Sequence, residues 1–129
     1  MKNILLLEDL PEIRAWIKAL VLEVFPKAQI SESARVHDAL GLVSALKFDL
    51  ALVDLGLPDG SGVDVVAALR ETQPEVQSVV VTIHDDDEHL FPALQAGAFG
   101  YVLKEQPREH FTEQLQRIKI GRASCRERV

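Results

Sequence analysis

The sequence predicts a doubly wound α/β domain with a five-stranded parallel sheet in strand order 2-1-3-4-5. Short apolar runs of strand length alternate along the chain with segments whose apolar residues recur at helical spacing. The central runs are apolar on both faces, which is typical of parallel strands covered by helices on each side. Acidic residues follow the first and third runs, which lie side by side in a sheet of this order, where ligands bind.

The strands are predicted from runs that are rich in apolar and β-branched residues. They occupy residues 3–8, 28–33, 49–54, 77–82 and 99–103.

The helices are predicted from apolar residues that share one helix face. In the first, these residues run from Ile13 to Val24, and Pro11 suits the opening turn. The fourth, over about residues 86–96, contains Pro92, which predicts a late start or a kink, and ends before Gly97. The remaining helices are marked by Val36, Leu40 and Val43, by Val65, Val66 and Leu69, and by Phe111, Leu115 and Ile118.

Composition fits one globular domain without a membrane span. The chain has 129 residues, of which 47% are hydrophobic and 26% are charged. No run of about 18 apolar residues occurs, and the N-terminus turns acidic too early for a signal peptide. We therefore expect a cytoplasmic protein.

The last ten residues, "IGRASCRERV", differ in composition from the rest of the chain. They hold the single cysteine, Cys125, and show no apolar periodicity. The string resembles the translation of a sequencing adapter, so we divide the chain into a domain over residues 1–119 and a non-native tail over 120–129. Without the tail, 11 basic residues face 19 acidic ones, a net charge of −8. Such a charge argues against nucleic-acid binding by this domain itself.

Charged and hydroxyl side chains gather at the carboxyl edge of the predicted sheet. Glu8 and Asp9 follow the first strand, Asp54 ends the third, Thr82 ends the fourth, and Lys104 follows the fifth. Crowded carboxylates need a cation, and ligands that are all oxygen favour Mg²⁺ over zinc. A carboxylate beside Mg²⁺ can act as a nucleophile that forms an aspartyl phosphate, with Lys104 and Thr82 holding phosphoryl oxygens.

Four stretches together identify a family. "LLLEDLPEIR", "DLALVDLGLPDGSGVDVV", "VVVTIHDDDE" and "AGAFGYVLKE" resemble the receiver domain of two-component response regulators, which has a flavodoxin-like, CheY-like fold. The stretch "DLGLPDGSG" is most similar to receivers of the branch that carries a C-terminal LuxR-type helix-turn-helix output domain.

The resemblance implies a specific role for each site residue. Asp54 would accept phosphate from a sensor histidine kinase, and Glu8, Asp9, Asp54 and the Gly56 carbonyl would hold Mg²⁺. Thr82 and Tyr101 would form the switch pair, and Lys104 would bridge to the phosphoryl group. Homodimerisation on phosphorylation and DNA binding through the missing output domain are further implications, and the role is transcription regulation rather than enzymatic turnover of a separate substrate.

Other interpretations remain open at this point. Phosphatases that form an aspartyl phosphate resemble this pattern but carry a second acid two residues after the nucleophile, where Gly56 stands. A stand-alone receiver that acts through protein partners is the alternative within the family. We interpret "HDDDEH" as a solvated helix start rather than a metal site, and Asp59 as a turn residue.

Overall fold

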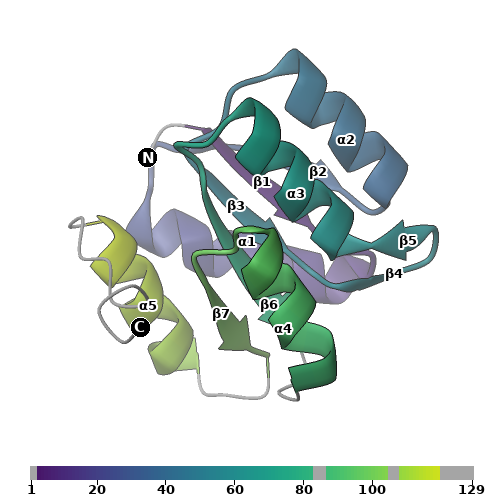
Figure 1. Cartoon of the computed structure of the whole chain (residues 1–129). Helices are drawn as coiled ribbons and strands as arrows, with labels where there is room; N and C mark the ends of the chain where they lie inside the picture. Colours follow the sequence, from purple (N-terminus) through teal and green to yellow (C-terminus); the bar gives the residue numbers. More distant parts are fainter. Residues whose placement is uncertain (1–2, 83–86, 105–107, 120–129) are drawn as a thin grey trace.

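The computed structural model describes residues 3–82, 87–104 and 108–119, which form a parallel sheet between two layers of helices (Figure 1). The tail over residues 120–129 and residues 84–86 of the "HDDDEH" segment lie outside the described residues, so both interpretations stay predictions. The large sheet consists of β1 (Asn3–Leu7), β2 (Gln29–Ser33), β3 (Leu50–Val53), β6 (Gln77–Thr82) and β7 (Gly100–Leu103). The helices are α1 (Pro11–Val24), α2 (Val36–Ala45), α3 (Gly62–Thr72), α4 (Asp87–Ala96) and α5 (Arg108–Lys119).

The strand order is β2-β1-β3-β6-β7, and every pairing in this sheet is parallel. The predicted order 2-1-3-4-5 is therefore confirmed, with β6 and β7 as the fourth and fifth strands. The labels differ because a two-stranded antiparallel hairpin intervenes, made of β4 (Gly56–Leu57) and β5 (Gly60–Ser61). The sequence indicated only a turn at this place.

Alternate residues of β1 supply the two cores of the domain. Ile4 and Leu6 pack with α1 and α5 on one face of the sheet, whereas Leu5 and Leu7 pack with α2 and α3 on the other. All four side chains are at most 1% exposed. Burial on both faces of the sheet thus explains why β1 has four consecutive apolar residues with no polar residue between them.

The termini of the helices follow from local chemistry. Pro11 opens α1, as predicted, where its missing N–H has no partner to lose. The Ser61 hydroxyl accepts a hydrogen bond from the Val63 N–H, 3.1 Å, and so caps α3. Pro92 lies inside α4, and Gly97, with φ of +118°, ends that helix as the sequence indicated.

Trp16 lies on α1 and is partly buried. Its ring packs edge to face on Phe111 of α5, with the ring centroids 5.9 Å apart. The core-facing position expected from helical spacing is confirmed. Within the described ranges, no helix combines the length and apolar character that crossing a bilayer requires.

Gly62 packs directly against the strand end that carries Asp54. A Cβ at this position would lie 2.1 Å from the Asp54 carbonyl oxygen and 2.6 Å from Val53 Cγ1. We expect Gly62→Ala to lower the free energy of unfolding by about 1–3 kcal/mol or more, because backbone cannot give way cheaply. Chemical denaturation of the two proteins measures this difference.

Gly41 of α2 provides the matched control, since a Cβ there meets nothing within 4 Å. Gly41→Ala should stabilise the domain by roughly 0.5–1 kcal/mol through helix propensity. Equal effects at the two glycines would contradict the close approach at Asp54.

Candidate functional site

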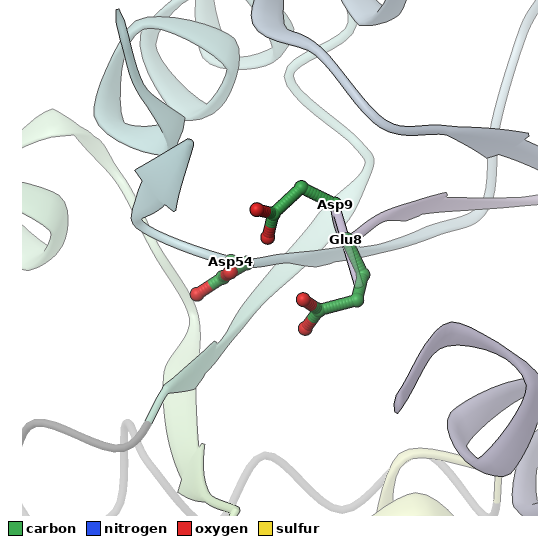
Figure 2. Close-up of side chains that lie close together, drawn as sticks. All are labelled: Glu8, Asp9 and Asp54. Atoms are coloured by element: carbon green, nitrogen blue, oxygen red, sulfur yellow. The ribbon is translucent and has the colours of Figure 1, made fainter. Parts of the chain in front are cut away.

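Three carboxylates meet at the carboxyl edge of the sheet. Glu8 and Asp9 directly follow β1, and Asp54 directly follows β3. One oxygen from each side chain can be chosen so that all lie within 4.8 Å of one another, and Figure 2 shows the three groups drawn together. Parallel pairing of β1 and β3 places both strand ends at the same level, which brings these acids together as predicted.

Main-chain hydrogen bonds extend the sheet ladder into the site. The Glu8 N–H donates to the Ser33 carbonyl and the Asp54 N–H donates to the Leu7 carbonyl, each at 3.0 Å. The two acids are therefore fixed to neighbouring strands although they stand just past the strand ends. The predicted strands 3–8 and 49–54 were one residue too long at this edge.

Lys104 supplies positive charge to the acidic cluster. Its Nζ lies 2.5 Å from Glu8 Oε1 and 3.4 Å from Asp54 Oδ2. The Glu8 residue is 0% exposed and Asp54 is 8% exposed, so water screens these contacts only weakly. The structure thus places Lys104 at the site, as the sequence predicted.

Burial makes the charged forms of both acids costly. Burial raises the pKa of Glu8. The contact with Lys104 lowers this pKa, and the negative charge of Asp54 raises it further. Burial also raises the pKa of Asp54; Lys104 opposes this, and the charge of Asp9 adds to it. One amine faces three carboxylates in the site, so a further cation would lower this cost.

The cluster has the chemistry of a site for a hard divalent cation. All three side chains offer oxygen ligands, which such ions prefer. Within the described part of the chain, the buried Glu8 Oε1 accepts no hydrogen bond of ordinary geometry, although Lys104 is its ionic neighbour. Glu8, Asp9 and Asp54 are therefore the residues that could hold a metal.

Two of the other predicted site residues lie in strands of the large sheet, and the third lies in the hairpin that follows β3. Thr82 is the last residue of β6, next to β3, and pairs in register with Leu103. Tyr101 of β7 pairs with Val80 and is 43% exposed. Gly56 begins β4, two residues after Asp54, and pairs with Ser61. The roles of Thr82, Tyr101 and the Gly56 carbonyl remain predictions.

Asp59 has a role that the sequence did not reveal. It lies in the turn of the β4–β5 hairpin, as expected, but its carboxylate also accepts hydrogen bonds from the main-chain N–H groups of Val36, 2.8 Å, and His37, 3.0 Å. These two donors lower the pKa of Asp59, and they begin helix α2. The segment that follows Asp54 is thus tied to a helix more than 20 residues earlier.

Family comparison agrees with the fold. Residues 4–116 match the response regulator receiver domain. This match covers most of the chain, and the chain belongs to that family. The resemblance found in the sequence and the flavodoxin-like fold are therefore confirmed, and the domain is a receiver of two-component response regulators.

Curated relatives include activators that are longer than this chain. The glycerol metabolism activator of Pseudomonas putida is 30% identical over 122 residues, which are 94% of this chain and 55% of the relative. The DNA-binding transcriptional activator DevR/DosR of Mycobacterium tuberculosis is 30% identical over 94 residues, 73% of this chain and 43% of the relative. The chain spans about half the length of the curated relatives it matches.

Solved receiver domains have the same fold. A CheY-like receiver domain protein from Methanospirillum hungatei JF-1 superposes with a TM-score of 0.81 at 26% identity, covering 100% of this chain and 99% of the other. A response regulator from Burkholderia pseudomallei, described with a phosphorylated aspartic acid, calcium ion and citrate, has a TM-score of 0.73 at 27% identity, covering 92% of this chain and 73% of the other.

The raised pKa of Asp54 predicts how stability depends on pH in the metal-free protein. When the pKa of a carboxyl is raised in the folded state, the folded protein loses stability as pH rises. The loss begins near the unfolded pKa, about 3.9 for Asp, and continues through the folded pKa. Asp54→Asn removes the buried charge, so we expect this variant to be more stable than wild type at neutral pH. The advantage should vanish well below the unfolded pKa, where Asp54 is protonated in both states.

Urea denaturation across this pH range, with a chelator present, measures the difference. Glu71→Gln, which changes an exposed acid of α3, is the matched control and should show no comparable dependence. A wild type that is more stable than Asp54→Asn at neutral pH would contradict the cost assigned to burial of Asp54.

Proposed function

We propose that Asp54 is the phosphoacceptor of this receiver domain and that Glu8, Asp9 and Asp54 hold Mg²⁺ for the reaction. The observation that carries the proposal is the meeting of these three carboxylates with Lys104 at the edge between β1 and β3. The Burkholderia pseudomallei neighbour, described with a phosphorylated aspartic acid, supports it. The carbonyl of Gly56 belongs to the proposed ligand set through the family resemblance.

In the proposed reaction, a carboxylate oxygen of Asp54 attacks phosphorus and forms the acyl phosphate P–O bond. The P–N bond of a phosphohistidine on a sensor kinase breaks, and the histidine nitrogen keeps the bonding electrons and takes a proton from solvent. Bound Mg²⁺ supplies positive charge that offsets the charge of the phosphoryl oxygens. Asp54 is 8% exposed, so part of it is accessible to such a donor.

Lys104 has two tasks in this proposal. In the unmodified protein its amine neutralises part of the charge of Glu8 and Asp54, at 2.5 and 3.4 Å. After transfer, the same amine is close enough to pair with a phosphoryl oxygen on Asp54. The hydroxyl of Thr82 is the other proposed contact of the phosphoryl group.

The proposed consequence is a shift between two conformations of the domain. Contacts of Thr82 and Lys104 with the phosphoryl group exist in one state alone, which is what a population shift requires. Tyr101, 43% exposed, is the proposed partner of Thr82 in this switch. Homodimerisation of the phosphorylated form belongs to the same proposal.

The domain is proposed to regulate an output domain rather than to turn over a substrate. Gly56 stands where a phosphatase would need its second acid, so no side chain is proposed for rapid hydrolysis. Relatives about twice as long, one of them a DNA-binding activator, support a helix-turn-helix output domain in the intact protein. We propose that residues 1–119 form the receiver domain and that residues 120–129 are non-native. The receiver domain is proposed to act in the cytoplasm with a sensor kinase.

Acetyl phosphate provides the direct test of the phosphoacceptor. In the presence of Mg²⁺, wild type should gain one labile phosphoryl group by intact mass, and Asp54→Asn should gain none. Asp9→Ala should weaken the dependence on Mg²⁺ by removing a ligand. Asp64→Asn, which changes an exposed acid of α3, is the matched control and should react like wild type. Equal phosphorylation of Asp54→Asn and wild type would refute the assignment.

DNA binding by this chain alone is expected to be absent. Residues 1–119 carry a net charge of −8 and lack the excess of Lys and Arg that neutralises phosphates. Gel-shift titration against mixed genomic fragments at low salt should show no complex, whether or not the chain is phosphorylated. Salt-sensitive binding would contradict this expectation, and a native stop codon near Lys119 would favour a stand-alone receiver that acts through protein partners.

A further inference from the structure

The side chain of Arg14 links the turn that carries two of the site acids to the edge strand β2. Arg14 lies in the first turn of α1, and its Nη1 donates to the main-chain carbonyl of Glu8 at 2.8 Å. Its Nε donates to Glu32 Oε1 of β2 at 3.3 Å. One guanidinium therefore holds a main-chain atom of a site residue and a carboxylate outside the site.

Among the described residues, two further hydrogen bonds lie within the turn after β1. The Leu10 N–H donates to Glu8 Oε2 at 3.2 Å, so the Glu8 side chain closes the turn on itself. The Arg14 N–H donates to the Leu10 carbonyl at 2.8 Å and begins α1. Asp9 lies between these contacts, and its direction depends on the peptide planes of Glu8 and Leu10.

We propose that Arg14 is a positioning residue of the metal site. By fixing the Glu8 carbonyl, it sets the main-chain path into Asp9 and resists the separation of Asp9 from Glu8 and Asp54 that their mutual repulsion favours. Glu32 in turn orients the guanidinium of Arg14. Groups outside the ligand set often fix the orientation of metal ligands in this way. The inference rests on the proposed function in one respect, namely that these three acids form the metal site.

A fixed planar donor is required for this task. Arginine presents several N–H donors in a rigid fork and can reach a carbonyl and a carboxylate in different directions at once. A lysine amine keeps the charge but not that geometry. Arg14→Lys therefore separates an effect of charge from an effect of position.

Lys18 offers a matched control on the same helix. Its Nζ contacts Glu32 Oε2 at 3.0 Å, so it shares the partner of Arg14. Among the described residues, the side chain that donates to the Glu8 carbonyl is Arg14 and not Lys18. The ion pairs of Glu32 are partly exposed, with side-chain exposures of 23% for Arg14 and 34% for Glu32. Pairs of this kind contribute little to stability, so Lys18→Ala should move the denaturation midpoint little.

Calorimetric titration with Mg²⁺ on the whole chain gives the first readout. We expect Arg14→Ala to weaken Mg²⁺ binding roughly tenfold or more, the effect usual for a partner of a metal ligand. Arg14→Lys should recover only a small part of the loss, and Lys18→Ala should bind like wild type. Amide hydrogen exchange without metal gives the second readout, and the Leu10 N–H should exchange faster in Arg14→Ala but not in Lys18→Ala.

The outcomes separate this inference from the proposed function. A wild type that binds Mg²⁺ together with an Arg14→Ala variant of equal affinity overturns the positioning role and leaves the metal site standing. Full rescue by Arg14→Lys, or an equal loss in Lys18→Ala, also overturns it, because charge alone would then explain the effect. A wild type that binds no Mg²⁺ overturns the proposed function, while exchange at Leu10 still decides whether Arg14 holds the turn.

Discussion

Mutual repulsion among Glu8, Asp9 and Asp54 is the constraint on which the local structure depends. Glu8 and Asp54 are almost fully buried, and Lys104 is their one cationic partner within the described residues. Left to themselves, such groups would separate or take up protons. Parallel pairing of β1 with β3 prevents separation, because the apolar residues of both strands are buried on both faces and cannot shift without exposing the two cores.

The loops that leave these strands are held by contacts from outside the site. Arg14 holds the turn after β1 through the Glu8 carbonyl. The segment after Asp54 is held twice: Asp59 accepts hydrogen bonds from the first N–H groups of α2, and Gly62 packs on the Asp54 carbonyl. The two well-packed cores therefore hold like charges close together. Functional sites are commonly positioned in this way by a rigid scaffold.

The sequence was sufficient for the sheet and for the acids, since both follow from patterns along the chain. Apolar strands that alternate with helices predicted the strand order, and the order alone placed Glu8, Asp54 and Lys104 at one edge. The contacts of Asp59 with α2 and of Arg14 with the Glu8 carbonyl could not be predicted. They join side chains to main-chain atoms across loops, and the periodic spacing of apolar residues in a sequence does not indicate which residues form such pairs. The hairpin was missed because each of its strands has two residues.

The restraints on the site are distributed unevenly over the sheet. Arg14 and Asp59 connect the acids to α1, β2 and α2, so the β1 and β3 loops are fixed by hydrogen bonds to main-chain atoms. Lys104, at the end of β7, is connected to the same acids by ion pairs alone among the contacts described. An ion pair responds directly to any change of charge on its partner, whereas a hydrogen bond to a carbonyl or from an amide does not. A change of charge at Asp54 therefore acts first on its ion pair with Lys104, which directly follows β7.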